Sequence, residues 1–150
     1  MAWVLVPMIT LQRTISVQQP VERVFTYLSD FTTTTEWDPG TVRTTRIKGD
    51  GGVGSEYHNT SRFAGRETEL TYVTEELVPN ERIALRGANK SVVSRDMMDL
   101  RSTTTGTDVI YTVEFEFKGV GKYLQPLLRL PLKKLADDAE QGMQRALAAI

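Results

Sequence analysis

The chain has 150 residues, no cysteine, one histidine and a formal net charge of −1. This length fits one domain, which we expect to cover residues 1–150 with a core of about residues 9–149. The composition excludes disulfides, thiolate chemistry and a zinc site made of several cysteines and histidines. A carboxylate site for calcium or magnesium remains open, but no EF-hand-like spacing is present, and we expect no metal and no cofactor. A nucleic-acid partner is not expected either, because such binders usually carry a strong basic excess.

The chain opens with the apolar run MAWVLVPMI. No basic residue precedes the run, Pro7 interrupts it, and it is too short to span a bilayer. We interpret residues 1–8 as an extension or an early strand rather than a targeting signal. The expectation is therefore a cytoplasmic protein without an integral membrane segment. Residues 3–6 are also a candidate contact of a homodimer.

Residues 9–18 alternate between apolar and polar side chains, which predicts a strand, with Arg13 as the one polar residue on its apolar face. Apolar residues at helical spacing predict a short helix over 20–29. A second short helix is expected over 31–36, because Asp30 is a good capping residue in front of it. The tripeptide Asp38-Pro39-Gly40 ends this helix as a turn.

Strand-forming residues then fill residues 41–117, and glycine, proline and asparagine interrupt them at turns. The interruptions predict six strands, at about 41–48, 53–63, 66–77, 81–87, 91–102 and 107–117. On the fifth of these six, we expect Met98 and Leu100 to point inward. The neighbours Arg95, Met97 and Asp99 then point outward, unless a bulge reverses the face.

After Gly121 the apolar period becomes helical. The apolar stripe consists of Leu124, Leu128, Leu132, Leu135, Ala139, Met143 and Ala146. Pro126 and Pro131 cannot lie inside a helix without kinking it. We therefore predict a short helical lead-in over 121–130 and a main helix over 132–149.

The order of elements predicts an α+β fold. A curved, seven-stranded antiparallel sheet surrounds a long C-terminal helix, and two short helices lie between the first and second strands. Only the final helix is long enough to cover the apolar face of the sheet. A helix held in a curved sheet packs poorly at one mouth, and this geometry predicts a cavity that suits an apolar ligand.

Several segments carry a family resemblance in their order and spacing. They are residues 14–17, 20–25, 36–39, 53–57, 73–79, 82–83 and 106–109. Together they resemble the START-related helix-grip superfamily (SRPBCC), in particular its polyketide cyclase/dehydrase and lipid-transport branch. The resemblance covers about residues 10–149 and implies the helix-grip fold with a ligand pocket between sheet and helix. It brings no universal catalytic residue, because this fold carries enzymes, carriers and signalling modules.

Strand alternation and the helical stripe together select the residues that we expect to line this pocket. They are Trp37, Tyr57, Asn59, Phe63, Tyr72, Met98, Tyr111, Val113, Phe115, Leu128, Leu132, Leu135 and Met143. Each of them is otherwise an ordinary core residue. For the buried polar groups among them, a hydrogen-bond partner within the protein is the favoured alternative to a ligand.

Tyr57 and Asp96 are the candidate catalytic residues. An inward Asp96 in apolar surroundings would have a raised pKa and could act as a general acid. An ion pair with an arginine of a neighbouring strand is the favoured alternative for this carboxyl group. His58 lies on the face opposite Tyr57, so we expect it to be exposed.

Three functions remain open at this point. The first is binding or transport of an apolar or amphipathic small molecule, such as a lipid, isoprenoid, quinone or polyketide-like compound. The second is a cyclase, aromatase or dehydratase acting on a polyketide-like chain. The third is a protein-interaction module with a filled core, which docks through exposed strand edges or through the basic cluster of Arg43, Arg46 and Lys48. That cluster is more simply explained as a solvated sheet edge.

Overall fold

The computed structural model describes residues 8–150, apart from the side chain of residue 120. The strands of this part are β1 (Met8–Val17), β2 (Thr41–Lys48), β3 (Glu56–Phe63), β4 (Arg66–Val78), β5 (Arg82–Ala88), β6 (Val92–Ser102) and β7 (Thr107–Phe117). The helical elements are α1 (Val21–Ser29), η1 (Phe31–Thr33), α2 (Thr34–Trp37), η2 (Gly119–Leu124) and α3 (Gln125–Ala148), where η denotes a 3₁₀ helix.

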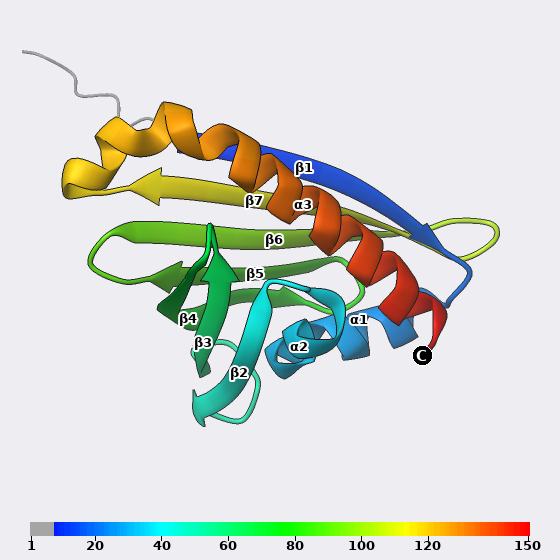
Figure 1. Cartoon of the computed structure of the whole chain (residues 1–150). Coiled ribbons are helices and arrows are strands. Elements are labelled where there is room, and N and C mark those ends of the chain that lie inside the picture. Colours follow the sequence, from blue (N-terminus) through cyan, green and yellow to red (C-terminus); the bar gives the residue numbers. More distant parts are fainter. Residues whose placement is uncertain (1–7) are drawn as a thin grey trace, which may run out of the picture.

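The strands form one antiparallel sheet in the order β1-β7-β6-β5-β4-β3-β2, with β1 and β2 at its edges. Register shifts interrupt the β2–β3 pairing twice and the β4–β5 pairing once, and such bulges bend a sheet. In Figure 1, β2 and β3 accordingly run across the direction of β6 and β7. The predicted α+β helix-grip fold is confirmed, including the short helices between β1 and β2.

The β3–β4 hairpin has the tightest turn in the sheet. Phe63 pairs with Arg66, so only two residues connect the strands. Both connecting residues, Ala64 and Gly65, have positive φ angles, of 51° and 79°. A two-residue turn with two positive φ angles matches the twist of an antiparallel pair, so β3 and β4 continue as one stiff ribbon up to this tip.

Helix α3 begins earlier than predicted and runs through Pro131 without a break. The expected lead-in is shorter, because the 3₁₀ helix η2 ends at Leu124 and Pro126 lies in the first turn of α3. Proline is tolerated in a first turn, where its missing N–H has no helical partner. Pro131 leaves only the carbonyl of Leu127 without a donor, and Leu127 is exposed, so water can take that bond.

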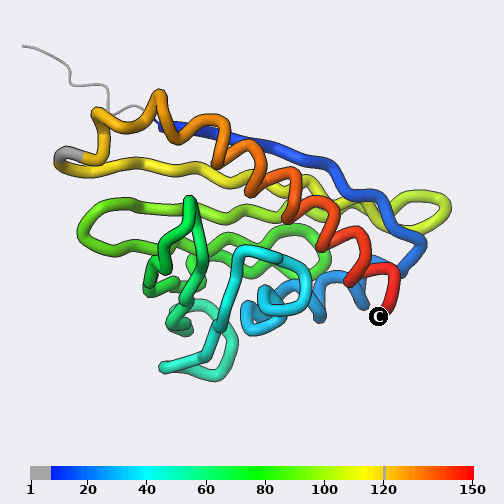
Figure 2. Tube along the Cα trace, in the orientation of Figure 1, coloured from blue at the N-terminus to red at the C-terminus, as the bar shows by residue number. Residues whose placement is uncertain are grey.

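Helix α3 lies between β1 on one side and α2 on the other. Figure 2 shows it passing from η2 across the sheet to the end where α1 lies. Arg13, the polar exception on β1, points toward this helix and pairs with Asp137 at 2.8 Å. Arg13 therefore interrupts the apolar pattern of β1 because it forms an ion pair between this strand and α3.

The space between sheet and helices is filled at one end. The largest completely buried side chains there belong to α1, the second half of α3 and the adjoining strand ends; they include Ile15, Leu28, Met98, Val109, Met143 and Leu147. Trp37 of α2 lies under α3, where its backbone carbonyl approaches Gly142. The other end, between the first turns of α3 and the β3–β4 hairpin, is not filled.

Within residues 8–150, no helix combines the length and apolar character that crossing a membrane requires. Met8 is the first residue of β1. The expected role of residues 3–6 in a dimer contact lies outside the described residues. The predicted sheet edge at β2 is present, and Arg43 and Arg46 are exposed on it.

Candidate functional site

A cavity occupies the unfilled end of the molecule. Its volume is about 100 Å³ for the centres of water-sized molecules, and about 620 Å³ when all space up to its open mouth is included. Ten of its fifteen lining residues are apolar or aromatic: Phe63, Leu70, Tyr72, Val92, Tyr111, Val113, Phe115, Phe117, Leu132 and Leu135. The other five are Asp38, Ser61, Thr68, Ser94 and Asp96.

Strand alternation brings these side chains together. The lining residues of β3, β4, β6 and β7 occur at every second position, as expected when one face of each strand points inward. β6 pairs with β5 and β7 without a register shift, so its inward face is continuous from Ser94 through Met98 to Leu100. All three are buried, which agrees with the predicted orientation of this strand.

Tyr72 owes its position to a glycine on the next strand. Its partner across the β4–β5 ladder is Gly87. A β-carbon on Gly87 would lie only 2.6 Å from the Tyr72 ring. The ring therefore packs against the backbone of β5 at Gly87, and Tyr72 also lines the cavity, to which β5 itself contributes no residue.

The polar centre of the cavity is the carboxyl group of Asp96. One oxygen accepts a hydrogen bond from the Ser94 hydroxyl at 3.2 Å, and the other accepts one from the Tyr111 hydroxyl at 3.2 Å. Asp96 is only 6% exposed. The expected ion pair with a neighbouring arginine is wrong, because Arg95 and Arg82 lie on the outer face and pair there with Glu116, Glu76 and Asp99.

Burial raises the pKa of Asp96 from 3.8 to about 7, and the nearby Asp38 adds to the rise. The hydrogen bonds from Tyr111 and Ser94 act in the opposite direction, because they stabilise the ionised form. Burial also raises the pKa values of the Tyr72 and Tyr111 hydroxyls, and the charge of Asp96 raises them further. These hydroxyls therefore stay protonated and available as hydrogen-bond donors.

Asp38 is the second carboxyl group on the cavity wall. It follows α2 directly, and its oxygens accept hydrogen bonds from the Gly40 amide and the Thr41 hydroxyl. Burial raises its pKa above 3.8, despite these two bonds. The cavity wall thus carries two carboxyl groups and no lysine, arginine or histidine. Within residues 8–150, no group of three or more metal-binding side chains is present.

Seven of the thirteen residues proposed for ligand binding lie on the cavity wall, as does the candidate catalytic residue Asp96. The seven are Phe63, Tyr72, Tyr111, Val113, Phe115, Leu132 and Leu135. All of them come from strand positions or helix turns near the open end.

The other six lie outside the wall: Trp37, Tyr57, Asn59, Met98, Leu128 and Met143. Trp37 packs edge-on against Tyr111, with 5.6 Å between ring centroids, and so supports the wall from behind. Asn59 bonds to Thr44 and Ser61 within the protein, as the favoured alternative foresaw.

Tyr57 packs edge-on against Phe31 and is separated from the cavity, so the geometry gives it no contact with a ligand there. His58 was expected to be exposed but is half-buried on the outer face, where its ring lies 3.5 Å from Glu69.

Alternation alone would have found six further lining residues, because they share strand faces with residues already selected: Ser61, Thr68, Leu70, Val92, Ser94 and Phe117. No local signal could have found Asp38. Its position in a turn suggested only a helix end, and it reaches the cavity because α2 lies under α3.

A sequence model described as "Polyketide cyclase / dehydrase and lipid transport" matches residues 8–149. The chain belongs to the polyketide cyclase/dehydrase and lipid transport family. The resemblance inferred from the short segments is thereby confirmed. No curated protein sequence matches this member of the family.

Solved structures extend the likeness at low sequence identity. The Zhui aromatase/cyclase from Streptomyces sp. R1128 has a TM-score of 0.80, with 15% identity over 93% of each chain. TTHA0849 from Thermus thermophilus has a TM-score of 0.67, with 16% identity over 93% of this chain and 99% of that one. Ara h 8.0201 has a TM-score of 0.61, with 14% identity over 91% of this chain and 98% of that one. At these identities the likeness shows that this family member shares their fold.

Proposed function

We propose that this protein binds or transports an apolar or amphipathic small molecule in the cavity between its sheet and α3. The observation that carries the proposal is the cavity itself, whose wall is mainly aromatic and aliphatic and which opens at one end. Such a wall gains about 25 cal/mol for each Å² of apolar surface that it removes from water. A filled core, which the protein-interaction alternative requires, does not fit this end of the molecule.

The size of the cavity limits what it can enclose. Drug-sized ligands usually occupy about 300–1,000 Å³. The enclosed volume of about 100 Å³ therefore suits one ring or one short branched segment. A lipid, isoprenoid, quinone or polyketide-like ligand would place one end in the cavity and extend the rest through the mouth between Phe63 and Leu135.

The polar wall groups restrict the chemistry of the enclosed end. Asp38 and Asp96 oppose a carboxylate or a phosphate there, because no basic side chain on the wall compensates a second negative charge. A hydroxyl, phenol or amine can instead donate a hydrogen bond to Asp96. With a pKa of about 7, Asp96 can accept a hydrogen bond when ionised and donate one when protonated. The ligand class that fits is therefore an apolar molecule whose leading end is a hydrogen-bonding group without a negative charge.

Filling the cavity tests this proposal. Leu135→Trp adds a bulky ring at the mouth and is expected to weaken binding of a lipophilic fluorescent dye at least tenfold. Leu127→Trp is the matched control, because Leu127 lies on the same helix but is exposed. Dye titration measures both. Equal affinities for the wild type and Leu135→Trp would refute binding in this cavity.

A second candidate function is favoured by the pair of Asp96 and Tyr111, whose polar atoms lie 3.2 Å apart inside the cavity. A carboxyl group with a pKa of about 7 can both donate and accept a proton near neutral pH. If the cavity positions one ring or one short reactive segment beside it, this pair suits a polyketide cyclase, aromatase or dehydratase.

The enzymatic candidate predicts that Asp96→Asn lowers turnover of a polyketide-like substrate at least a hundredfold, while dye affinity changes less than threefold. Tyr111→Phe should lower turnover less, because the carboxyl group remains. Product formation followed by mass spectrometry measures the turnover. Unchanged turnover in Asp96→Asn would leave only the binding function.

A further inference from the structure

Helix α3 and the preceding η2 carry an apolar surface that the fold does not use. Tyr123, Leu124, Leu127 and Leu130 are 75%, 51%, 75% and 78% exposed. We call these four residues the outer patch. They lie within eight consecutive residues, whereas isolated exposed apolar residues are common on any protein, so the clustering itself requires an explanation.

Helix geometry places the outer patch away from the core. With about 100° between successive residues, Leu127 and Leu130 lie roughly 140–160° around the helix from Leu132. Leu132 is buried against the cavity, and Leu135 lies on the same side. The first turns of α3 therefore carry two apolar stripes, one toward the cavity and one toward solvent.

Basic residues surround the outer patch. Residues 118–134 contain Lys118, Lys122, Arg129, Lys133 and Lys134 and no acidic residue, although the whole chain has a net charge of −1. Lys133 and Lys134 pair with Asp137 and Asp138 on the next turn, at 3.3 and 2.7 Å, so Lys118, Lys122 and Arg129 supply the basic charge beside the patch. The Lys122 ammonium group lies 5.2 Å from the centre of the Tyr123 ring. Arg129, Leu130 and Lys133 also line a shallow groove that reaches Met8 on β1.

We propose that the outer patch docks this protein on the surface of an anionic lipid bilayer. Exposed leucines and an aromatic residue flanked by lysine and arginine are the features by which helices lie in a membrane interface. The apolar side chains enter the boundary between headgroups and acyl chains, and the cations bind lipid phosphates. Contact between two copies of this face would bring basic residues against basic residues, which opposes a symmetric dimer.

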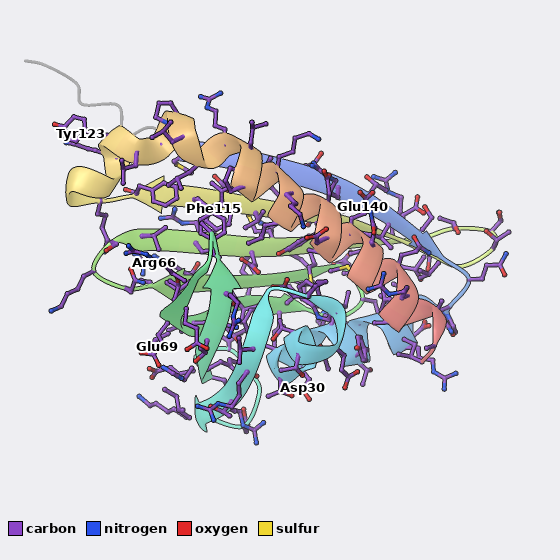
Figure 3. The ribbon with its side chains drawn as sticks, viewed as in Figure 1. Asp30, Arg66, Glu69, Phe115, Tyr123 and Glu140 are labelled. Carbon is purple, nitrogen blue, oxygen red and sulfur yellow. The ribbon has the colours of Figure 1, made fainter. Side chains whose placement is uncertain are left out.

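The outer patch lies at the open end of the cavity. Phe117 and Leu135 line the cavity, and η2, with Tyr123, follows directly after β7. Figure 3 shows Tyr123 pointing away from the sheet at the end of the molecule where β7 finishes beyond Phe115. Docking through the outer patch would therefore place the end of the molecule that contains the cavity near the bilayer, with the cavity on the opposite side of α3. The proposal itself rests on exposure and charge, and it stands whether or not the cavity binds a ligand.

Vesicle co-sedimentation with the full chain tests the docking. One vesicle preparation contains phosphatidylcholine alone, and the other contains about 30% phosphatidylglycerol. The wild type is expected to bind the anionic vesicles in 50 mM NaCl, to bind them less in 300 mM NaCl because salt screens the charges, and to bind neutral vesicles at least tenfold less.

Two double variants measure separately how much the apolar side chains and the basic charges contribute to vesicle binding. Leu127→Ser with Leu130→Ser should weaken vesicle binding at least tenfold, since both side chains lose their apolar contact with the bilayer. Lys122→Gln with Arg129→Gln should weaken it about fivefold for each charge removed. All four side chains are exposed, so circular dichroism should report the wild-type fold.

Matched controls change the same residue types elsewhere. Ile47→Ser with Val53→Ser removes two exposed apolar side chains near β2, and Arg23→Gln with Arg101→Gln removes two exposed charges from α1 and β6. Both controls should bind anionic vesicles as the wild type does.

Four results would overturn the docking proposal. They are no binding to anionic vesicles, equal binding to neutral vesicles, unchanged binding of the double leucine variant, or loss of binding only when residues 1–7 are deleted. A dimer that the leucine variant dissociates, without any vesicle binding, would instead assign the outer patch to self-association.

Discussion

Gly142→Ala is expected to lower the free energy of unfolding by about 3 kcal/mol, a large effect for the addition of one methyl group. A β-carbon at this position would lie 1.9 Å from the carbonyl oxygen of Trp37 and 2.9 Å from its carbonyl carbon. Both contacts are with backbone, so a side-chain rotation cannot relieve them. Helix α3 and α2 must move apart, and this cost exceeds the roughly 1 kcal/mol that alanine gains over glycine inside a helix.

The same displacement should reach the cavity. Trp37 packs against Tyr111, and Asp38 follows Trp37 on the cavity wall. When α2 moves, both supports of the polar centre move with it. We therefore expect weaker dye binding in Gly142→Ala even where the variant is folded.

Thermal and urea unfolding measure the stability effect, and a loss of about 3 kcal/mol should lower Tm by roughly 6–12 °C in a chain of this size. Gly121→Ala is the matched control. The nearest atoms to its added β-carbon lie 3.9 Å away, so its stability should change by less than about 0.5 kcal/mol. An unfolding free energy of Gly142→Ala close to that of the wild type would show that α3 does not approach α2 this closely.

The second large effect concerns Asp96 and pH. The folded protein raises the pKa of Asp96 from 3.8 to about 7, so it retains a proton that the unfolded chain has already released between these values. Stability must then decrease as pH rises through this window, by about 1.4 kcal/mol for each pH unit, and it should not decrease further above pH 7 on account of this residue. Burial raises the pKa of Asp38 too, which adds to the decrease in the same direction.

Asp96→Asn removes the ionisation while keeping an oxygen that can accept a bond from Tyr111 or Ser94. From pH 5 to pH 8, the variant should gain about 3 kcal/mol in stability relative to the wild type, because two pH units of the window lie within this range. Urea unfolding at pH 5, 6, 7 and 8 measures the difference. Replacing the carboxyl group by an amide also changes the stability by an amount that does not depend on pH. This amount cancels when the stability difference between variant and wild type at pH 8 is compared with that at pH 5.

Asp99→Asn provides the control for this series. Asp99 lies on the same strand but on its outer face, where it pairs with Arg82 at 2.7 Å. Its effect on stability should be the same at pH 5 and pH 8. A wild-type stability that rises from pH 5 to pH 8, or an Asp96→Asn curve parallel to it, would mean that Asp96 is not buried as an uncharged group.

The elements of the fold could be predicted because their signals are local. In β7 every second residue from Val109 to Phe117 is apolar or aromatic, and the β3–β4 turn carries Gly65 where a positive φ angle is needed. Pro131 shows the limit of such rules. A proline predicts a helix break, yet the continuous α3 tolerates it, because packing of Leu132 and Ala136 stabilises the helix and the lost bond falls on its solvent side.

For the candidate site, the sequence predicts which face of each strand points inward, but not which inward residues border the cavity. Tyr111 and Val113 lie on the cavity wall, but Met98 and Met143 share the same apolar pattern and lie in the filled end. No residue pattern distinguishes a packed side chain from one that borders a cavity. The difference depends on how far α3 lies from each strand, and that distance is set by contacts such as Gly142 against Trp37, 105 residues apart in the chain.

From its order of residues alone, this chain determines an antiparallel sheet, the helix that covers it, and a family likeness, since hydrophobic period and turn residues act between neighbours along the backbone. Only the folded molecule decides which end stays hollow, that Asp96 meets Tyr111 and Ser94 rather than an arginine, and that Leu127 and Leu130 face outward. The reason is geometric. The burial and the electrostatic surroundings of a residue depend on how closely segments distant in the sequence pack together, and the local sequence pattern does not determine those distances.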